Sequence, residues 1–154
     1  RSLIEMTRKY IPHADITTDI IVGFPSETDE EFKETLNMVK DVRFTTAFMF
    51  AYSVREGTRA AEMEDNIPRE VKLARLKELV DQQTEITRSI YESFVGKELE
   101  VLVSGRQEKK DKLWMGMDQG CKRVLLSCEN AEAGMIFKVR AVKSSGMTLI
   151  CERT

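Results

Sequence analysis

Residues 17–36 read TTDIIVGFPSETDEEFKETL and predict a strand, a tight loop and the start of a helix. The run 19–22 is short and β-branched, which is typical of a strand buried on both faces in a parallel sheet. Gly23 releases the backbone to turn where that strand ends. Thr28 is followed three residues later by Glu31, the spacing of a capping box at a helix N-terminus. The connecting loop therefore follows the carboxyl end of a strand, where α/β folds bind ligands, although an ordinary turn has the same spacing.

The segments around this stretch continue the same pattern. We expect a strand over 16–22, a helix over 28–41 and an aromatic-rich strand over 46–52. A strand–helix–strand unit predicts a parallel pair with a right-handed crossover. A long helix then begins at Pro68, carries an apolar stripe to Phe94 and ends near Gly96, a plausible C-cap.

After Gly96 the hydrophobic period changes from helical to two. The strand candidates lie at 99–103, 113–117, 122–126, 136–142 and 147–151. Short strands separated by glycine turns at this spacing predict a small antiparallel barrel. The expected fold class is thus an α/β segment followed by a small all-β barrel.

Composition and charge set limits on the kind of protein. The chain has 154 residues, of which 42% are hydrophobic and 32% charged, and no apolar run approaches the ~20 residues that span a bilayer. The net charge of −2 divides into −5 for residues 1–95 and +3 for residues 96–154. The three cysteines show no CxxC spacing, so we expect free thiols in a reducing cytoplasm. Because the sequence opens at Arg1 inside a helical pattern, we expect it to be a piece of a longer protein.

Four segments together resemble one family. They are TTDIIVGFPSET (17–28), FMFAYSVREGTRAAEM (48–63), DNIPREVKLARLKELVDQQTEI (65–86) and VGKELEVLV (95–103). The chain resembles the C-terminal part of the radical S-adenosylmethionine methylthiotransferases of the MiaB type, which modify transfer RNA. The resemblance implies that residues 1–67 are the end of a partial βα barrel, 68–95 a bridging helix and 96–154 a TRAM domain, an OB-like RNA-binding barrel.

The chain departs from the family pattern at three loop positions. Ser26 stands where the family usually has a second glycine, and Val54 and Arg59 stand where it usually has prolines. Both loops are therefore expected to be less rigid than those of the family.

The resemblance also implies cofactors. Family members hold S-adenosylmethionine and [4Fe-4S] clusters, one of them through a CxxxCxxC motif that this chain lacks. We therefore expect no catalytic residue and no metal ligand in this chain, which would be inactive by itself. Ile21, Val22 and Gly23 would line the adenine side of S-adenosylmethionine, since a flat base needs apolar walls and close backbone approach. The alternative for Ile21 and Val22 is a place in the core.

Candidate substrate contacts follow from the second strand and its loop. Phe48, Phe50 and Tyr52 alternate, so they share one face of the strand and could stack on a nucleobase or pack in the core. Arg55 follows in a loop that we expect to be exposed. Its side chain could contact a phosphate or could simply be solvated.

In the predicted barrel, basic residues surround the single tryptophan, Trp114. They are Arg106, Lys109, Lys110, Lys112, Lys122 and Arg123. Charge for phosphate and a ring for stacking are what a single-stranded RNA surface requires, although charge runs are more often solvated faces.

The predicted function is that of a transfer-RNA methylthiotransferase. The parent enzyme would add a methylthio group to isopentenyl-adenosine beside the anticodon, with the anticodon stem-loop as partner and no membrane. The alternatives are a sister enzyme acting on an aspartate of a ribosomal protein and a non-enzymatic RNA-binding module. An unpaired strand edge in the first segment also predicts a possible homodimer.

Overall fold

The computed structural model describes residues 2–12, 14–107 and 113–154, which form two compact units. The first unit contains residues 2–5 and Ile16–Thr87, and the second contains residues from Met6–Asp15 and Arg88–Thr154. Two helices, α1 (Ser2–Tyr10) and α3 (Arg69–Glu92), contribute to both units. None of the described residues of α1 is buried.

A parallel strand pair forms the centre of the first unit. β1 (Thr17–Val22) pairs with β2 (Thr46–Ala51) in register from Thr17↔Thr46 to Val22↔Ala51. The helix α2 (Asp29–Val42) connects them, so the predicted strand–helix–strand unit is confirmed. The register places the ends of both strands, and the loops that follow them, at the same edge of the sheet.

The start of α2 is fixed by its capping box. The Thr28 side chain accepts from the Glu31 amide at 3.2 Å, and the Glu31 carboxylate accepts from the Thr28 amide at 2.8 Å. The hydrogen bond from the Thr28 backbone lowers the pKa of Glu31. At the other end Arg43 adopts a left-handed conformation and its amide donates to Val39. The predicted N-terminal signal is therefore confirmed, and it decides where the loop after β1 ends.

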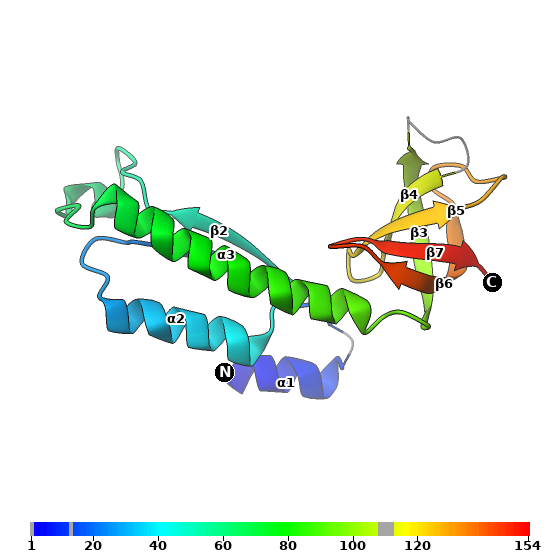
Figure 1. Cartoon of the computed structure of the whole chain (residues 1–154), viewed down its shortest axis with the longest axis horizontal. Helices are drawn as coiled ribbons and strands as arrows, with labels where there is room; N and C mark the ends of the chain where they lie inside the picture. Colours follow the sequence, from blue (N-terminus) through cyan, green and yellow to red (C-terminus); the bar gives the residue numbers. More distant parts are fainter. Residues whose placement is uncertain (1, 13, 108–112) are drawn as a thin grey trace. The chain divides into compact units, whose positions relative to one another are not determined.

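The helix α3 packs against α2 and bonds to the carbonyl groups of Phe44 and Thr45, just before β2. Gln82 Nε2 donates to the Leu36 carbonyl at 2.7 Å, and the two helices lie alongside each other in Figure 1. Buried apolar side chains fill the space between the elements: Val22, Phe32, Val39, Val42, Phe44, Leu79 and Ile86. The same helix also buries polar side chains, namely Lys72, Arg75, Gln83 and Thr87. The apolar stripe expected on this helix is therefore interrupted by buried polar groups.

A closed barrel forms the second unit. Its strands within the described residues are β3 (Glu98–Arg106), β4 (Leu113–Asp118), β5 (Arg123–Ser127), β6 (Ile136–Ser144) and β7 (Leu149–Arg153). They close in the order β3-β4-β5-β7-β6. The predicted five-stranded barrel is confirmed, but the prediction that it is wholly antiparallel is wrong, because β5 and β7 pair in parallel. An odd number of strands around a closed ring cannot alternate in direction at every step.

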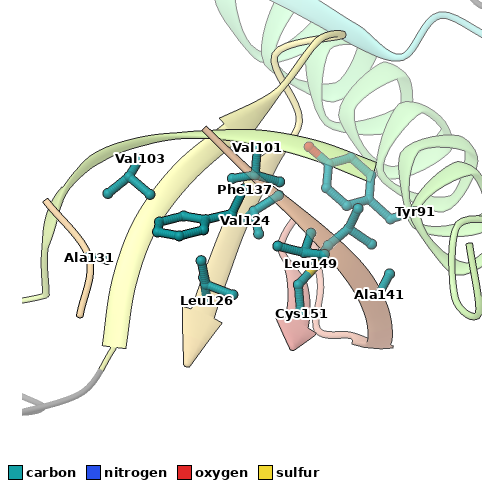
Figure 2. Packing of buried hydrophobic residues seen from close by; sticks show 11 residues of the cluster. Tyr91, Val101, Val103, Val124, Leu126, Ala131, Phe137, Ala141, Leu149 and Cys151 are labelled. Carbon is teal, nitrogen blue, oxygen red and sulfur yellow. The ribbon is translucent and has the colours of Figure 1, made fainter. Parts of the chain in front are cut away.

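The barrel interior is filled by alternate residues of its strands. Figure 2 shows the buried cluster, which consists of Tyr91, Val101, Val103, Val124, Leu126, Ala131, Phe137, Val139, Ala141, Leu149 and Cys151. Gly116 of β4 lies opposite Val103 of β3. A Cβ at this position would lie 2.6 Å from the Leu102 carbonyl oxygen, so a larger residue would force the strands apart.

The cysteines of the barrel differ in burial, and this predicts their reactivity. Burial raises the pKa of the Cys151 thiol to about 11 from its ordinary 9.0, whereas Cys121 is exposed. At pH 8 iodoacetamide should modify Cys121 and spare Cys151 until the chain is unfolded, which peptide mass spectrometry will resolve. The folded chain holds the Cys151 proton more tightly than the unfolded chain, so its stabilising contribution is lost as pH rises from 9.0 through about 11. Equal labelling of both thiols in the folded chain would contradict this placement.

Candidate ligand loop and RNA surface

The loop 23–27, which we name the ligand loop, is held in an unusual backbone conformation. Gly23 and Ser26 both have positive φ, 69° and 68°. The Gly23 amide donates to Glu27 Oε2 at 2.7 Å, and the Ser26 amide donates to Asn66 Oδ1 at 2.9 Å. A serine in this region is strained where a glycine is not, so Ser26 adds to the cost of ordering the loop.

The guanidinium of Arg75 on α3 holds the far end of the ligand loop. Its Nη1 donates to Glu27 Oε2 at 2.7 Å and to the Glu27 carbonyl at 3.0 Å, and its Nη2 donates to Asp29 Oδ1 at 2.6 Å. Burial disfavours the charge of Arg75, but its bonds to Asp29 and Glu27 outweigh this and raise its pKa. The ion pairs therefore keep a charged side chain stable in a position that is largely hidden from water.

Lys72, one helical turn earlier, contacts the loops that follow both strands. A Cβ on Gly23 would lie 2.5 Å from Lys72 Cγ, so the lysine stem occupies the space beside the glycine. Lys72 Nζ binds Asp65 Oδ2 at 2.6 Å and lies 5.1 Å from the Tyr52 ring centroid. The Tyr52 hydroxyl in turn donates to the Ala60 carbonyl at 2.9 Å.

The structure separates the three residues that we predicted beside the cofactor. The Ile21 side chain is 53% exposed, whereas Val22 is fully buried in the core of the first unit. Gly23 is buried too, and contact with Lys72 already accounts for its lack of a side chain. Ile21 therefore offers a side chain to a ligand, whereas the side chain of Val22 does not reach the surface.

The aromatic residues of β2 are divided in the same way. Phe50 is 54% exposed and lies opposite Ile21 in the parallel register, and Phe48 is exposed on the same face. Ile21 and Phe50 thus form an exposed apolar pair close to the carboxyl ends of both strands, the kind of wall that a flat purine requires. Tyr52 is half-buried and its hydroxyl is bonded within the chain, while Arg55 is exposed in the loop beyond.

Of the residues predicted at the RNA surface of the barrel, the structure brings Arg106 and Trp114 together. Arg106 is exposed and its guanidinium lies 5.9 Å from the Trp114 ring centroid. Trp114 is half-buried against the barrel core and its Nε1 donates to the Cys128 carbonyl at 3.1 Å. Arg123 is exposed on β5. The predicted contacts Lys109, Lys110 and Lys112 lie outside the described residues.

The prediction that Lys122 lies on the RNA surface is wrong, because its side chain is buried. It is 3% exposed, and its ammonium group pairs with Asp15 and Asp118 and lies 4.4 Å from the Phe94 ring centroid. Burial opposes its charge, but the two carboxylates outweigh this and raise its pKa. Lys122 therefore fastens the segment before β1 to the β4–β5 turn and is not available to phosphate.

The described residues hold no group of three or more histidine, cysteine or acidic side chains that could bind a metal ion. Cys121, Cys128 and Cys151 are free thiols of the barrel unit. The donor set described here therefore does not fit an iron–sulfur cluster. In the same residues, no helix is both long and apolar enough to cross a membrane.

A parallel strand–helix–strand unit and a closed five-stranded barrel define a mixed α/β segment with a small barrel. A fold of this kind does not identify a function by itself. No family model matches the chain. The chain is 42% identical over 139 residues to the tRNA-2-methylthio-N(6)-dimethylallyladenosine synthase of Acetivibrio thermocellus, covering 90% of this chain and 29% of that protein. Proteins of the same name from Symbiobacterium thermophilum and Clostridium novyi are 43% and 38% identical, covering 96% and 98% of this chain and 31% and 33% of theirs.

The chain thus spans about a third of the length of the curated relatives it matches. The segment that it matches is their C-terminal part. The predicted resemblance is confirmed: this chain is homologous to the C-terminal part of the MiaB-type tRNA methylthiotransferases.

The buried lysine of the barrel unit leads to a stability prediction. Replacing Lys122 by Met leaves Asp118 and Asp15 buried without their cation, since their side chains are 6% and 14% exposed. We expect the free energy of unfolding to fall by about 3 kcal/mol or more in urea titrations. The matched control is Lys138→Met, which removes an exposed lysine of β6 and should change stability by less than about 0.5 kcal/mol. If both variants unfolded at the same urea concentration, Lys122 would not be a structural anchor.

Proposed function

We propose that this chain is the C-terminal segment of a tRNA methylthiotransferase, in which the β1–β2 unit forms part of the cofactor wall and the barrel binds RNA. The observation that carries the proposal is the identity of 37–43% over about nine tenths of the chain with enzymes named for 2-methylthio-dimethylallyladenosine synthesis in tRNA. The exposed pair Ile21 and Phe50 supports the first part, because both lie near the edge where parallel strands bind ligands.

S-adenosylmethionine and the clusters of the parent enzyme would supply the radical and methyl-transfer chemistry. In this chain Ile21 would contact the adenine, while Val22 anchors the strand in the core and the Gly23 amide is held by Glu27. Phe50 would stand beside the base, and Arg55 would meet a substrate phosphate. We assign no catalytic residue and no cluster ligand to this chain, and we expect it to be inactive alone.

For the barrel we propose a TRAM-like RNA-binding role. Arg106, Trp114 and Arg123 would form the described part of the surface, with Lys109, Lys110 and Lys112 as further predicted contacts. The balance of +3 over residues 96–154 supports a polyanionic partner. We propose that residues 1–67 are the end of a partial βα barrel, 68–95 a bridging helix and 96–154 the TRAM domain.

The proposed substrate is a dimethylallyl-adenosine beside the anticodon, on the anticodon stem-loop of tRNA, in the cytoplasm. The names of the relatives and the basic barrel favour it over an aspartate of a basic ribosomal protein. The two described strands of the β1–β2 sheet each leave one edge unpaired, so two isolated copies of this chain would also pair there.

RNA binding by the chain should depend steeply on salt. The affinity for an anticodon stem-loop, followed by the fluorescence of the single Trp114, should fall by roughly 0.7 log units per log unit of salt for each phosphate contacted. Arg106→Ala and Arg123→Ala should each lower that slope by about 0.7, because each removes one contact. Lys33→Ala, an exposed change on α2, is the control and should leave the slope unchanged. An affinity that did not vary with salt, or a Lys33 variant that behaved like the arginine variants, would refute the proposed surface.

A further inference from the structure

Two buried cations on α3 have no part in the proposed contacts with cofactor or RNA. Lys72 is 6% exposed and Arg75 is 8% exposed, and they lie one helical turn apart. Lysine and arginine are almost never fully buried unless they are paired, so their burial here points to a particular role. Both side chains contact the ligand loop, which makes that loop the place to look for the role.

Arg75 is linked to the end of β1 by a chain of hydrogen bonds. Its Nη1 donates to Glu27 Oε2 at 2.7 Å, and the same oxygen accepts the Gly23 amide at 2.7 Å. The Glu27 side chain is 11% exposed, so the carboxylate is held between the two donors and away from most solvent. Charge-assisted bonds of this geometry are short and directional, so the position of Arg75 fixes that of the Gly23 amide.

Lys72 acts on the same loop from the side. Its stem fills the space next to Gly23, while its ammonium group is held by Asp65 and lies over the Tyr52 ring. The Tyr52 ring also meets the Phe24 ring edge-on, with centroids 5.2 Å apart. The loops that follow β1 and β2 are thus joined through one lysine.

We propose that Arg75 and Lys72 are positioning residues that hold the ligand loop in the shape in which it receives S-adenosylmethionine. This inference rests on the proposed function. Gly23 and Ser26 both adopt positive φ, and the strained conformation of Ser26 persists only where surrounding contacts over-determine it. Without Arg75 the Glu27 carboxylate loses its cationic partner and is no longer fixed in place. The Gly23 amide then loses a fixed acceptor, and the loop that follows Ile21 is no longer held.

The test uses the whole 154-residue chain, labelled for nuclear magnetic resonance, and two readouts. The first is hydrogen exchange of the Gly23 amide, and the second is the shift of the loop amides on titration with S-adenosylmethionine. Arg75→Met removes both ion pairs and keeps the apolar stem. The matched control is Lys77→Met, which removes the exposed pair with Asp81 from the same helix. Arg75→Lys is the conservative variant, able to restore one of the two ion pairs.

We expect Arg75→Met to lose protection of the Gly23 amide and to weaken binding of S-adenosylmethionine by roughly 10-fold. Losses of this size follow at metal sites when a group that hydrogen-bonds a ligand residue is removed. Amides of the barrel core should keep their shifts, Lys77→Met should match the parent chain, and Arg75→Lys should fall between. If Arg75→Met does not fold, Glu27→Gln takes its place, because it keeps an acceptor for Gly23 but removes the charge that orients it.

The two proposals fail in different ways. Unchanged Gly23 protection together with unchanged binding in Arg75→Met would overturn the positioning role. Where Glu27→Gln takes its place, unchanged binding of S-adenosylmethionine would overturn it. A parent chain whose loop amides do not respond to S-adenosylmethionine would instead refute the cofactor contact proposed for this segment. In that case Gly23 protection still decides whether Arg75 shapes the loop.

Discussion

The buried ion pair between Arg75 and Glu27 is the contact on which the first unit depends. It joins α3 to the loop after β1, and the same Glu27 carboxylate accepts a hydrogen bond from the Gly23 amide. Breaking a buried pair from one side leaves an uncompensated charge, so the pair tolerates change poorly. The barrel unit contains a counterpart, since buried Lys122 ties Asp15 to Asp118 in the β4–β5 turn. In both units a buried cation holds an irregular segment that regular hydrogen bonding does not fix.

In the first unit, buried and exposed residues lie next to one another at the end of β1. Val22 and Gly23 are buried, whereas the side chain of Ile21 is exposed opposite Phe50. In the barrel, the half-buried ring of Trp114 is fixed by its indole bond to the Cys128 carbonyl, with Arg106 over it. The side chains that we propose as ligand contacts thus lie beside buried neighbours, an arrangement that gives a site precision at a loop or a barrel rim.

Local signals in the sequence predicted most of the fold. The capping box of Thr28 and Glu31 needs only neighbouring residues, and alternation alone indicated the five barrel strands. The buried cations were missed because a basic residue is usually solvated. Their partners are also distant in the sequence: Arg75 meets Glu27 across 48 positions and Lys122 meets Asp15 across 107. The same limit explains why Lys122 was predicted at the RNA surface. The parallel pairing between β5 and β7 could not be predicted from hydrophobic periodicity. Periodicity indicates which face of a strand a residue lies on, but not the direction of the neighbouring strand.

The central claim is that this chain can serve as the C-terminal segment of a tRNA methylthiotransferase. The most direct test replaces the matching segment of the Acetivibrio thermocellus relative with this chain and expresses the chimera in cells that lack their own enzyme. Mass spectrometry of digested tRNA then measures methylthio-modified dimethylallyladenosine, with the unaltered relative as control. We predict that the chimera restores the modification. A chimera that accumulates in folded form with its clusters, yet leaves the tRNA unmodified, would contradict it.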